Sequence, residues 1–206
     1  MNPTKQNPLS RGDTGALIAF CGAGVAIATT ITILSGVRIA ELARGTDVPV
    51  LVEFVGQRVE IPLGAGGTGV VPVELDRATI TAPELPMMAT VPGILGQIIQ
   101  IITIIVVIGS LILLARSMLS GRIFGRGRTT LVATAGITGL VGFAMVRFFE
   151  NMLANATVAA VTDTADANAV ISVEPFTFIL AAFVVALITT VFVIGDRLQR
   201  DTEGLV

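Results

Sequence analysis

The sequence predicts an all-α membrane protein: a four-transmembrane-helix bundle with a small extracytoplasmic β-unit between the first and second helices. Hydrophobic residues make up 53% of the 206 residues and charged residues only 14%, with a mean hydropathy of +0.86. A soluble domain carries about 25% charged residues. Four apolar segments also approach the roughly 20 residues that a helix needs to cross a bilayer. We expect a single membrane domain over residues 1–206.

The four apolar segments are the predicted membrane spans. They run from Ala16 to Val37, from Ile94 to Ala115, from Thr130 to Phe149 and from Phe176 to Ile194. The first also resembles a secretory signal, because Lys5 and Arg11 precede it and Ala26-Ile27-Ala28 resembles a cleavage site. Its apolar run continues past Ala28, so we interpret it as a span.

The basic residues predict the orientation of the spans, since cytoplasmic flanks carry an excess of positive charge. Eight of the thirteen basic residues fall on one side: Lys5, Arg11, Arg116, Arg122, Arg126, Arg128, Arg197 and Arg200. The five on the other side are offset by eleven acidic residues. We therefore expect a multi-pass protein of the cell membrane with both termini in the cytoplasm.

Residues 43–90 form a predicted β-rich insertion between the first two spans. They contain short β-branched runs with partial alternation, separated by glycine and proline, which are typical of strands and tight turns. These runs cover residues 48–54, 57–61, 69–75 and 78–81. We expect three or four strands that rest on the outer ends of the helices, because the unit is too small to bury a core of its own.

A glycine-rich motif lies within this insertion. Gly64 to Gly69 matches the G-x-G-x-x-G pattern of dinucleotide-binding proteins. That mechanism needs a helix after the motif, whose N-terminus holds the pyrophosphate, and here Val70-Val71-Pro72-Val73 follows instead. We interpret the motif as a loop of the β-unit.

A basic loop between the second and third spans is the candidate contact region. Its glycines and arginines could wrap an anion, but it lacks the Lys-Ser or Lys-Thr ending of a phosphate-binding loop. We interpret Arg116, Arg122, Arg126 and Arg128 as residues that set topology and contact lipid headgroups, at about 1 kcal/mol each, or a partner protein. Specific anion binding is the alternative.

Two Arg–Glu pairs mark the outer ends of the first and third spans. Arg38 and Glu41, and likewise Arg147 and Glu150, are three residues apart, which places each pair on one helix face. They form either two separate pairs or a cross-helix cluster that links Arg38 with Glu150 or Arg147 with Glu41 beneath the β-unit.

Small residues on the first and third spans predict that these two helices are neighbours, because close backbone approach favours helix packing in membranes. They are Gly15, Ala19, Gly22, Ala23 and Ala26 in the first span and Ala135, Gly136, Gly139 and Gly142 in the third.

The composition argues against catalysis. The chain has no histidine and one cysteine, Cys21, so the commonest general base, the commonest metal ligand and any intramolecular disulfide are excluded. No charged residue lies near the expected midplane of a span, which argues against proton-coupled transport. We expect no catalytic residue, no cofactor, no metal and no direct contact with nucleic acid.

The chain resembles bacterial four-span membrane proteins of the domain of unknown function 2975 family. The span layout with one long outer loop, the turn Gly121-Arg122-Ile123-Phe124 up to Leu131, and the tail from Gly195 to Val206 carry the resemblance. The family's turn often continues with an asparagine where this chain has Arg126 to Arg128. Members have no established activity, and some are encoded beside a helix-turn-helix regulator, which implies a cytoplasmic regulator or membrane protein as partner.

The sequence favours a non-enzymatic signalling, regulatory or interaction module of the bacterial cytoplasmic membrane. The alternative is a small transport or toxin-immunity membrane protein. The tail from Arg197 to Val206 is either an amphipathic helix for a partner or a solvated end.

Overall fold

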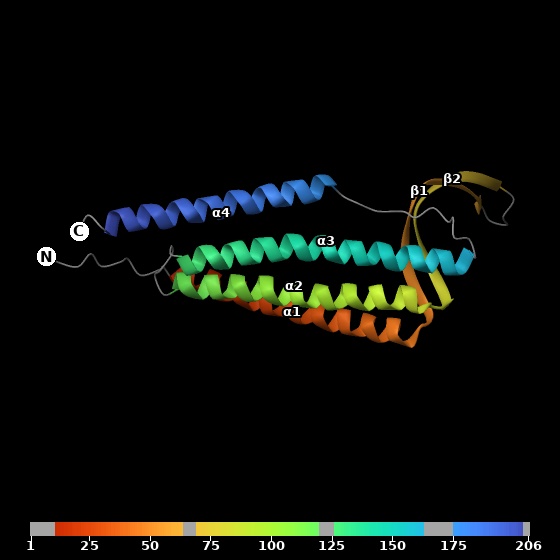
Figure 1. Ribbon diagram of the computed structural model, residues 1–206, viewed down its shortest axis with the longest axis horizontal. Coiled ribbons are helices and arrows are strands. Elements are labelled where there is room, and N and C mark those ends of the chain that lie inside the picture. The colour runs from red at the N-terminus through yellow and green to blue at the C-terminus, as the bar shows by residue number, and fades with distance from the viewer. Residues whose placement is uncertain (1–10, 64–68, 120–125, 163–174, 204–206) are drawn as a thin grey trace. The chain divides into compact units, whose positions relative to one another are not determined.

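The computed structural model describes residues 11–63, 69–119, 126–162 and 175–203. In chain order its elements are α1 (Arg11–Arg44), β1 (Thr46–Leu63), β2 (Gly69–Glu84), α2 (Met87–Leu119), α3 (Arg126–Thr162) and α4 (Pro175–Glu203) (Figure 1). Residues 64–68 of the glycine-rich motif lie outside the described residues.

All four helices are long and apolar enough to cross a membrane. Each contains one of the predicted spans and continues beyond it; α3, for example, has 37 residues. At 1.5 Å per residue α3 is about 55 Å long, whereas the hydrocarbon core of a bilayer is about 30 Å thick. The helix is thus longer than its apolar segment requires.

The described residues divide into two compact units. The first, here called the helical unit, takes its residues from 1–35, 98–144 and 174–206. The second, here called the hairpin unit, takes its residues from 36–97 and 145–173. It therefore holds the end of α1, both strands, the start of α2 and the end of α3.

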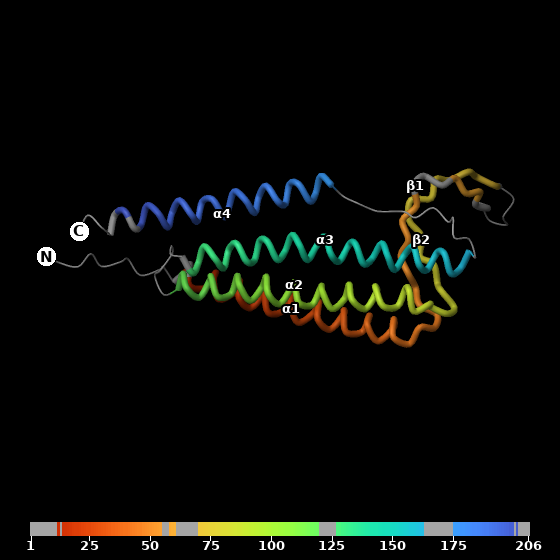
Figure 2. The backbone as a smooth tube through the Cα atoms, in the orientation of Figure 1, coloured from red at the N-terminus to blue at the C-terminus, as the bar shows by residue number. Residues whose placement is uncertain are grey.

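Strands β1 and β2 pair as one long antiparallel hairpin (Figure 2). All four short runs expected from the sequence are in strand conformation, but they lie on two continuous strands rather than on three or four. A register shift between Glu53 and Gln57 marks the place where the first two runs join. The irregularity interrupts the pairing without ending the strand, as β-bulges do.

The base of the hairpin packs on helix ends within the hairpin unit. Val48, Val50 and Val52 are buried while Pro49 and Leu51 between them are exposed, so β1 has one buried face. The core that they join also contains Leu42, Ala82, Leu85, Ala89, Leu153 and Ala154. The expectation that the β-unit rests on the helices is met at this core.

Gly45 forms the junction between α1 and β1. Its φ of +68° lies in the left-handed region that favours glycine at a helix C-terminus. Its carbonyl oxygen accepts a 2.8 Å hydrogen bond from the Leu85 backbone N–H, which ties the start of β1 to the segment after β2.

Glycines bring the helices of the helical unit close together. A Cβ added at Gly24 of α1 would lie 3.2 Å from Ile108 of α2. A Cβ added at Gly142 of α3 would collide with Thr103 of α2. One added at Gly136 would collide with Val185 of α4.

These neighbours differ from the prediction. The α3 glycines pack on α2 and α4 rather than on α1, and the sites of a Cβ at Gly15 and Gly22 of α1 have no described atom within 4 Å. The contacts of these glycines therefore give no support to the prediction that α1 and α3 are neighbours.

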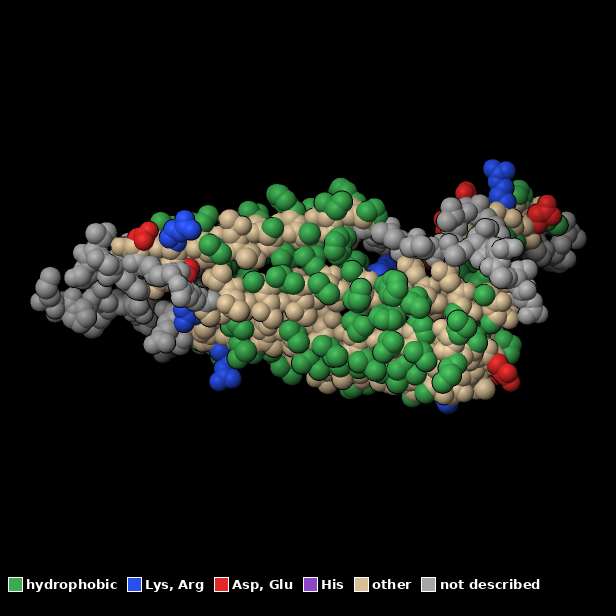
Figure 3. All heavy atoms as spheres, in the orientation of Figure 1, with side chains coloured by type: hydrophobic (Ala, Val, Ile, Leu, Met, Phe, Trp, Pro, Cys, Tyr) green, Lys and Arg blue, Asp and Glu red, His purple; other side chains and the backbone are tan. Residues whose placement is uncertain are grey.

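Hydrophobic side chains cover much of the visible helix surface (Figure 3). On α4, Phe176, Ile179 and Phe183 are 77%, 65% and 66% exposed. Burying one such side chain is worth about 1.5–3 kcal/mol. The helix surfaces therefore suit an apolar environment better than water.

Candidate functional site

The hairpin unit contains a partly open cavity of about 200 Å³. Four elements supply its walls: the end of α1, the base of β1, the start of α2 and the end of α3. The lining residues are Arg38, Val50, Leu51, Val52, Glu53, Gln97, Arg147, Glu150, Asn151, Leu153, Ala154 and Asn155. Three of the four residues predicted at the outer helix ends thus reach one cavity, and the fourth, Glu41, is paired with Arg38.

Arg38 links α1 to β1 at the edge of this cavity. Its Nη1 donates a 2.9 Å hydrogen bond to Glu41 Oε2, three residues along the same helix. Its Nη2 donates a 2.6 Å hydrogen bond to the Pro49 carbonyl oxygen on β1. Since the side chain is only 26% exposed, these bonds fix the guanidinium against the cavity wall.

Arg147 and Glu150 form a looser pair on α3. Arg147 Nη1 lies 3.4 Å from Glu150 Oε2, and the two side chains are 36% and 48% exposed. Each of the two arginines thus forms its ion pair with the glutamate of its own helix. Arg38, Arg147 and Glu150 also line the cavity.

The formal charges around the cavity balance. The lining includes Arg38 and Arg147 as well as Glu53 and Glu150, which makes two cations and two anions. Glu53 is held by Arg77, the nearest atoms being 2.9 Å apart, across β1 and β2.

Side-chain amides complete the polar lining. Gln97 of α2 and Asn151 and Asn155 of α3 line the cavity, and an amide side chain has both hydrogen-bond donors and an acceptor; Asn151 and Asn155 already have interactions within the chain. Guanidinium groups recognise carboxylates, and carboxylates recognise ammonium groups. The lining therefore contains both kinds of charged group that recognise a small zwitterion.

Sequence reasoning missed Glu53, Asn151 and Asn155 as site residues. A signal for the asparagines is present, because Arg147, Asn151 and Asn155 are spaced by four residues and so share one helix face. Gln97 lies near the start of the second span, and its amide is the only signal that the sequence gives for it. Glu53 carries no such signal, since its position depends on the pairing of the strands.

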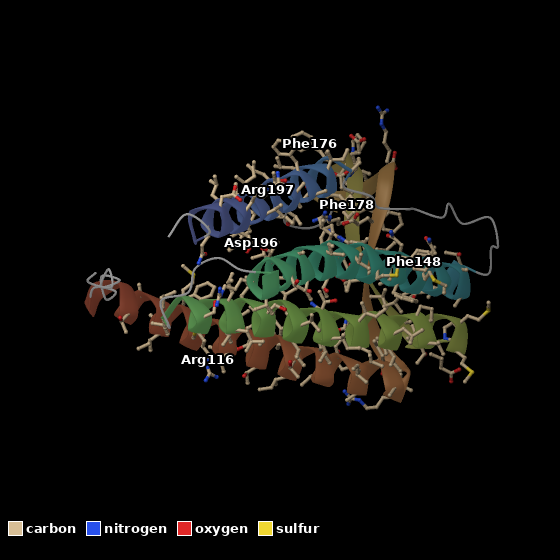
Figure 4. All side chains as sticks on the ribbon, turned by 60° about the vertical axis from the view of Figure 1, so that its left-hand side comes forward. Arg116, Phe148, Phe176, Phe178, Asp196 and Arg197 are labelled. Atoms are coloured by element: carbon tan, nitrogen blue, oxygen red, sulfur yellow. The ribbon has the colours of Figure 1, made fainter. Side chains whose placement is uncertain are left out.

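The structure describes only part of the basic loop. Arg116 is exposed in the last turn of α2 (Figure 4), and Arg128 lies in the first turn of α3. Arg126 begins α3. The side chain of Arg126 and the whole of Arg122 lie outside the described residues.

The helix dipole has opposite effects on the arginines at the two ends of the basic loop. Arg116 suits the negative C-terminal end of α2, whereas Arg126 and Arg128 sit at the positive N-terminal end of α3, where a cation is unfavourable. The helix dipole therefore does not explain why arginines occur at positions 126 and 128.

No metal-binding cluster stands out in the part of the chain that the structure describes, as judged by groups of three or more His, Cys, Asp or Glu residues.

The fold defines a class: a chain of four long apolar helices with a β-hairpin inserted after the first and a polar cavity at the hairpin base. No family model, curated protein or solved structure matches the chain. The resemblance to the domain of unknown function 2975 family therefore stays a prediction.

Proposed function

We propose that this chain is a non-enzymatic, multi-pass protein of the bacterial cell membrane that binds a small zwitterion in the hairpin-unit cavity and signals its presence to a cytoplasmic or membrane partner. The observation that carries the proposal is the balanced lining of that cavity, with two arginines, two glutamates and three side-chain amides around about 200 Å³. A free amino acid has the matching chemistry: one carboxylate, one ammonium group and little volume.

Membrane placement is supported by the four candidate spans and by their exposed hydrophobic side chains. The excess of arginine at one set of helix ends supports cytoplasmic termini, which would put the cavity on the outer side. Unfavourable helix dipoles at Arg126 and Arg128 favour a topological role for these two residues.

Signalling is supported by the continuity of the helices that line the cavity. Arg38, Gln97 and Arg147 belong to α1, α2 and α3, and each of these helices continues without a break into its apolar segment. A ligand that changes the packing at the cavity acts directly on three helices that reach the bilayer. Rigid helices are among the elements that carry coupling between distant sites.

Thermal unfolding of the purified full-length chain in detergent tests the ligand class. We expect a zwitterionic amino acid to raise the melting temperature, since a ligand at 100 times its Kd stabilises the folded state by about 2.7 kcal/mol. Succinate and putrescine, with unbalanced charge, should raise it less. Arg38→Gln should abolish the shift, whereas Arg58→Gln, which changes an exposed arginine outside the cavity, should leave it intact.

The result against the proposal is a panel of zwitterions that leaves the melting temperature unchanged, or a shift that persists in Arg38→Gln. Uptake of the same ligand into vesicles that contain the protein would favour the transport alternative. A crosslinking pull-down with the full chain, and with residues 197–206 deleted, tests the partner; unchanged complexes after the deletion would remove the tail from the contact.

A further inference from the structure

A second cavity, of about 870 Å³, lies within the helical unit between α3 and α4. Its lining residues are Thr129, Thr130, Ala133, Thr134, Ile137, Thr138, Val193, Asp196, Arg197 and Asp201. Its volume falls within the range of about 300–1,000 Å³ that is typical of ligand pockets. None of the functions discussed above uses it.

The α3 wall is a stripe of hydroxyl groups. Thr130, Thr134 and Thr138 are spaced by four residues, which places them on one face of the helix. Thr129 Oγ1 is buried and has no hydrogen-bond partner among the described residues. Because that oxygen is shielded, an occupant of the cavity meets the stripe of Thr130, Thr134 and Thr138 rather than Thr129 Oγ1.

The α4 wall carries a buried carboxylate. Asp196 is 7% exposed and is the one buried side chain among the described residues of α4. It lies on the side of α4 that faces α3, beside Arg197 (Figure 4). With Asp201 the lining holds two carboxylates and one guanidinium, so its formal charge is −1.

The cavity is amphipathic along the helix axes. Thr129 is the fourth residue of α3 and Asp201 the third from the end of α4, so this end of the cavity is polar and close to the helix ends. Ala133, Ile137 and Val193 lie further along both helices. An occupant therefore meets charged groups near the helix ends, and beyond them the apolar side chains of Ala133, Ile137 and Val193 beside the Thr134 and Thr138 hydroxyls.

We propose that this cavity binds an aminophospholipid of the phosphatidylethanolamine type from the cytoplasmic leaflet. Arg197 pairs with its phosphate, Asp196 and Asp201 accept hydrogen bonds from its ammonium group, and its acyl chains lie along Ile137 and Val193. The proposal rests on the membrane placement proposed above but not on the zwitterion in the hairpin unit.

The charged residues of the lining should favour one lipid headgroup over the others. A phosphatidylcholine headgroup has no N–H to donate to Asp196 or Asp201. A phosphatidylglycerol headgroup has no cation and would bring its negative charge next to two carboxylates. Only a headgroup with both a phosphate and a primary ammonium group matches the whole lining.

Native mass spectrometry of the full chain, released from nanodiscs with equal amounts of the three lipids, tests the proposal. We expect phosphatidylethanolamine to be retained about tenfold over phosphatidylcholine, a ratio that corresponds to about 1.4 kcal/mol. Asp201→Asn, at an exposed position, and Asp196→Asn should each remove this preference. Thr134→Val should reduce it, whereas Thr190→Val should not, because Thr190 does not line the cavity and its hydroxyl donates to the Ala186 carbonyl oxygen.

Equal retention of all three lipids by the wild-type chain overturns the proposal, as does an unchanged preference in both aspartate variants. The two proposals fail separately. A chain that enters nanodiscs without selecting a lipid refutes only the lipid site. A melting temperature that amino acids leave unchanged refutes only the proposed ligand of the hairpin unit. A chain that stays outside the nanodiscs refutes membrane placement and the lipid site together.

Discussion

Gly142→Ala tests the packing of α3 on α2 by adding a single methyl group. The added Cβ would collide with Oγ1 and Cγ2 of Thr103 and would lie 2.7 Å from its Cβ. Because Thr103 Cβ is attached to the α2 backbone, no rotation of the threonine side chain relieves that last contact. The two helices must move apart locally.

The chain offers a matched control in Gly139→Ala on the same helix. There the added Cβ would lie 3.7 Å from Val107 Cγ2, an ordinary van der Waals contact. Both changes gain about 0.5–1 kcal/mol from replacing a helical glycine by alanine. Only Gly142→Ala also suffers overpacking, which costs about 1–3 kcal/mol. We expect Gly139→Ala to be more stable than Gly142→Ala by about 1–3 kcal/mol.

Unfolding of the detergent-solubilised protein, followed by circular dichroism during titration with sodium dodecyl sulfate, measures this difference. Adding Thr103→Ala to Gly142→Ala removes Oγ1 and Cγ2, so it should restore part of the lost stability. The double-mutant cycle should show coupling of about 0.5–3 kcal/mol. Equal stability of the two glycine variants, or additivity in the cycle, would show that α2 and α3 do not meet at these residues.

The remaining predictions concern the hairpin base and the basic loop. Val50→Ala removes two methyl groups from a side chain that is 2% exposed, so it should lower the free energy of unfolding by about 2 kcal/mol. Leu51→Ala, at a side chain that is 59% exposed, should change this free energy by less than about 0.5 kcal/mol. Thermal unfolding of the two variants measures the difference. Replacing Arg122, Arg126 and Arg128 by glutamine should scramble the orientation of the second and third spans in reporter fusions; wild-type topology combined with the loss of a partner would identify the loop as a binding site instead.

Hydropathy sufficed to predict the helices, because an apolar run long enough to cross a bilayer must make its backbone hydrogen bonds within the segment, as a helix does. The number of strands was harder to predict. The polar residues around Gln57 break the alternation of β1 and suggest a turn, but the chain absorbs them as a register shift and remains extended. A local pattern cannot distinguish a bulge from a strand end when the partner strand is unknown.

The glycines of α3 show why a sequence predicts close packing better than it predicts the neighbour. Gly136 and Gly142 are six residues apart, a rotation of about 600°, so they point to faces about 120° apart. They accordingly pack against different helices, with Val185 of α4 next to one and Thr103 of α2 next to the other.

The candidate site was predictable to a similar degree. Arg38, Arg147 and Glu150 were predicted as members of ion pairs at the helix ends, because a spacing of three residues fixes a shared helix face, but not as the lining of a cavity. The contribution of Glu53 required the tertiary arrangement, since β1 brings it to the cavity only through its packing on α3 residues such as Leu153. Local sequence patterns therefore predicted the charged residues at the helix ends, whereas the cavity that they line depends on contacts between distant parts of the chain.

The register shift between Glu53 and Gln57 has a practical consequence for experiments on this protein. The hairpin base before the shift contributes to the hydrophobic core, whereas side chains beyond it, such as Arg58 and Glu74, are exposed. A fluorophore or affinity tag attached at Arg58 or Glu74 should therefore leave the fold unchanged. Such a label gives the experimenter a reporter for the orientation of the chain in intact cells, accessible from outside only if the proposed topology holds.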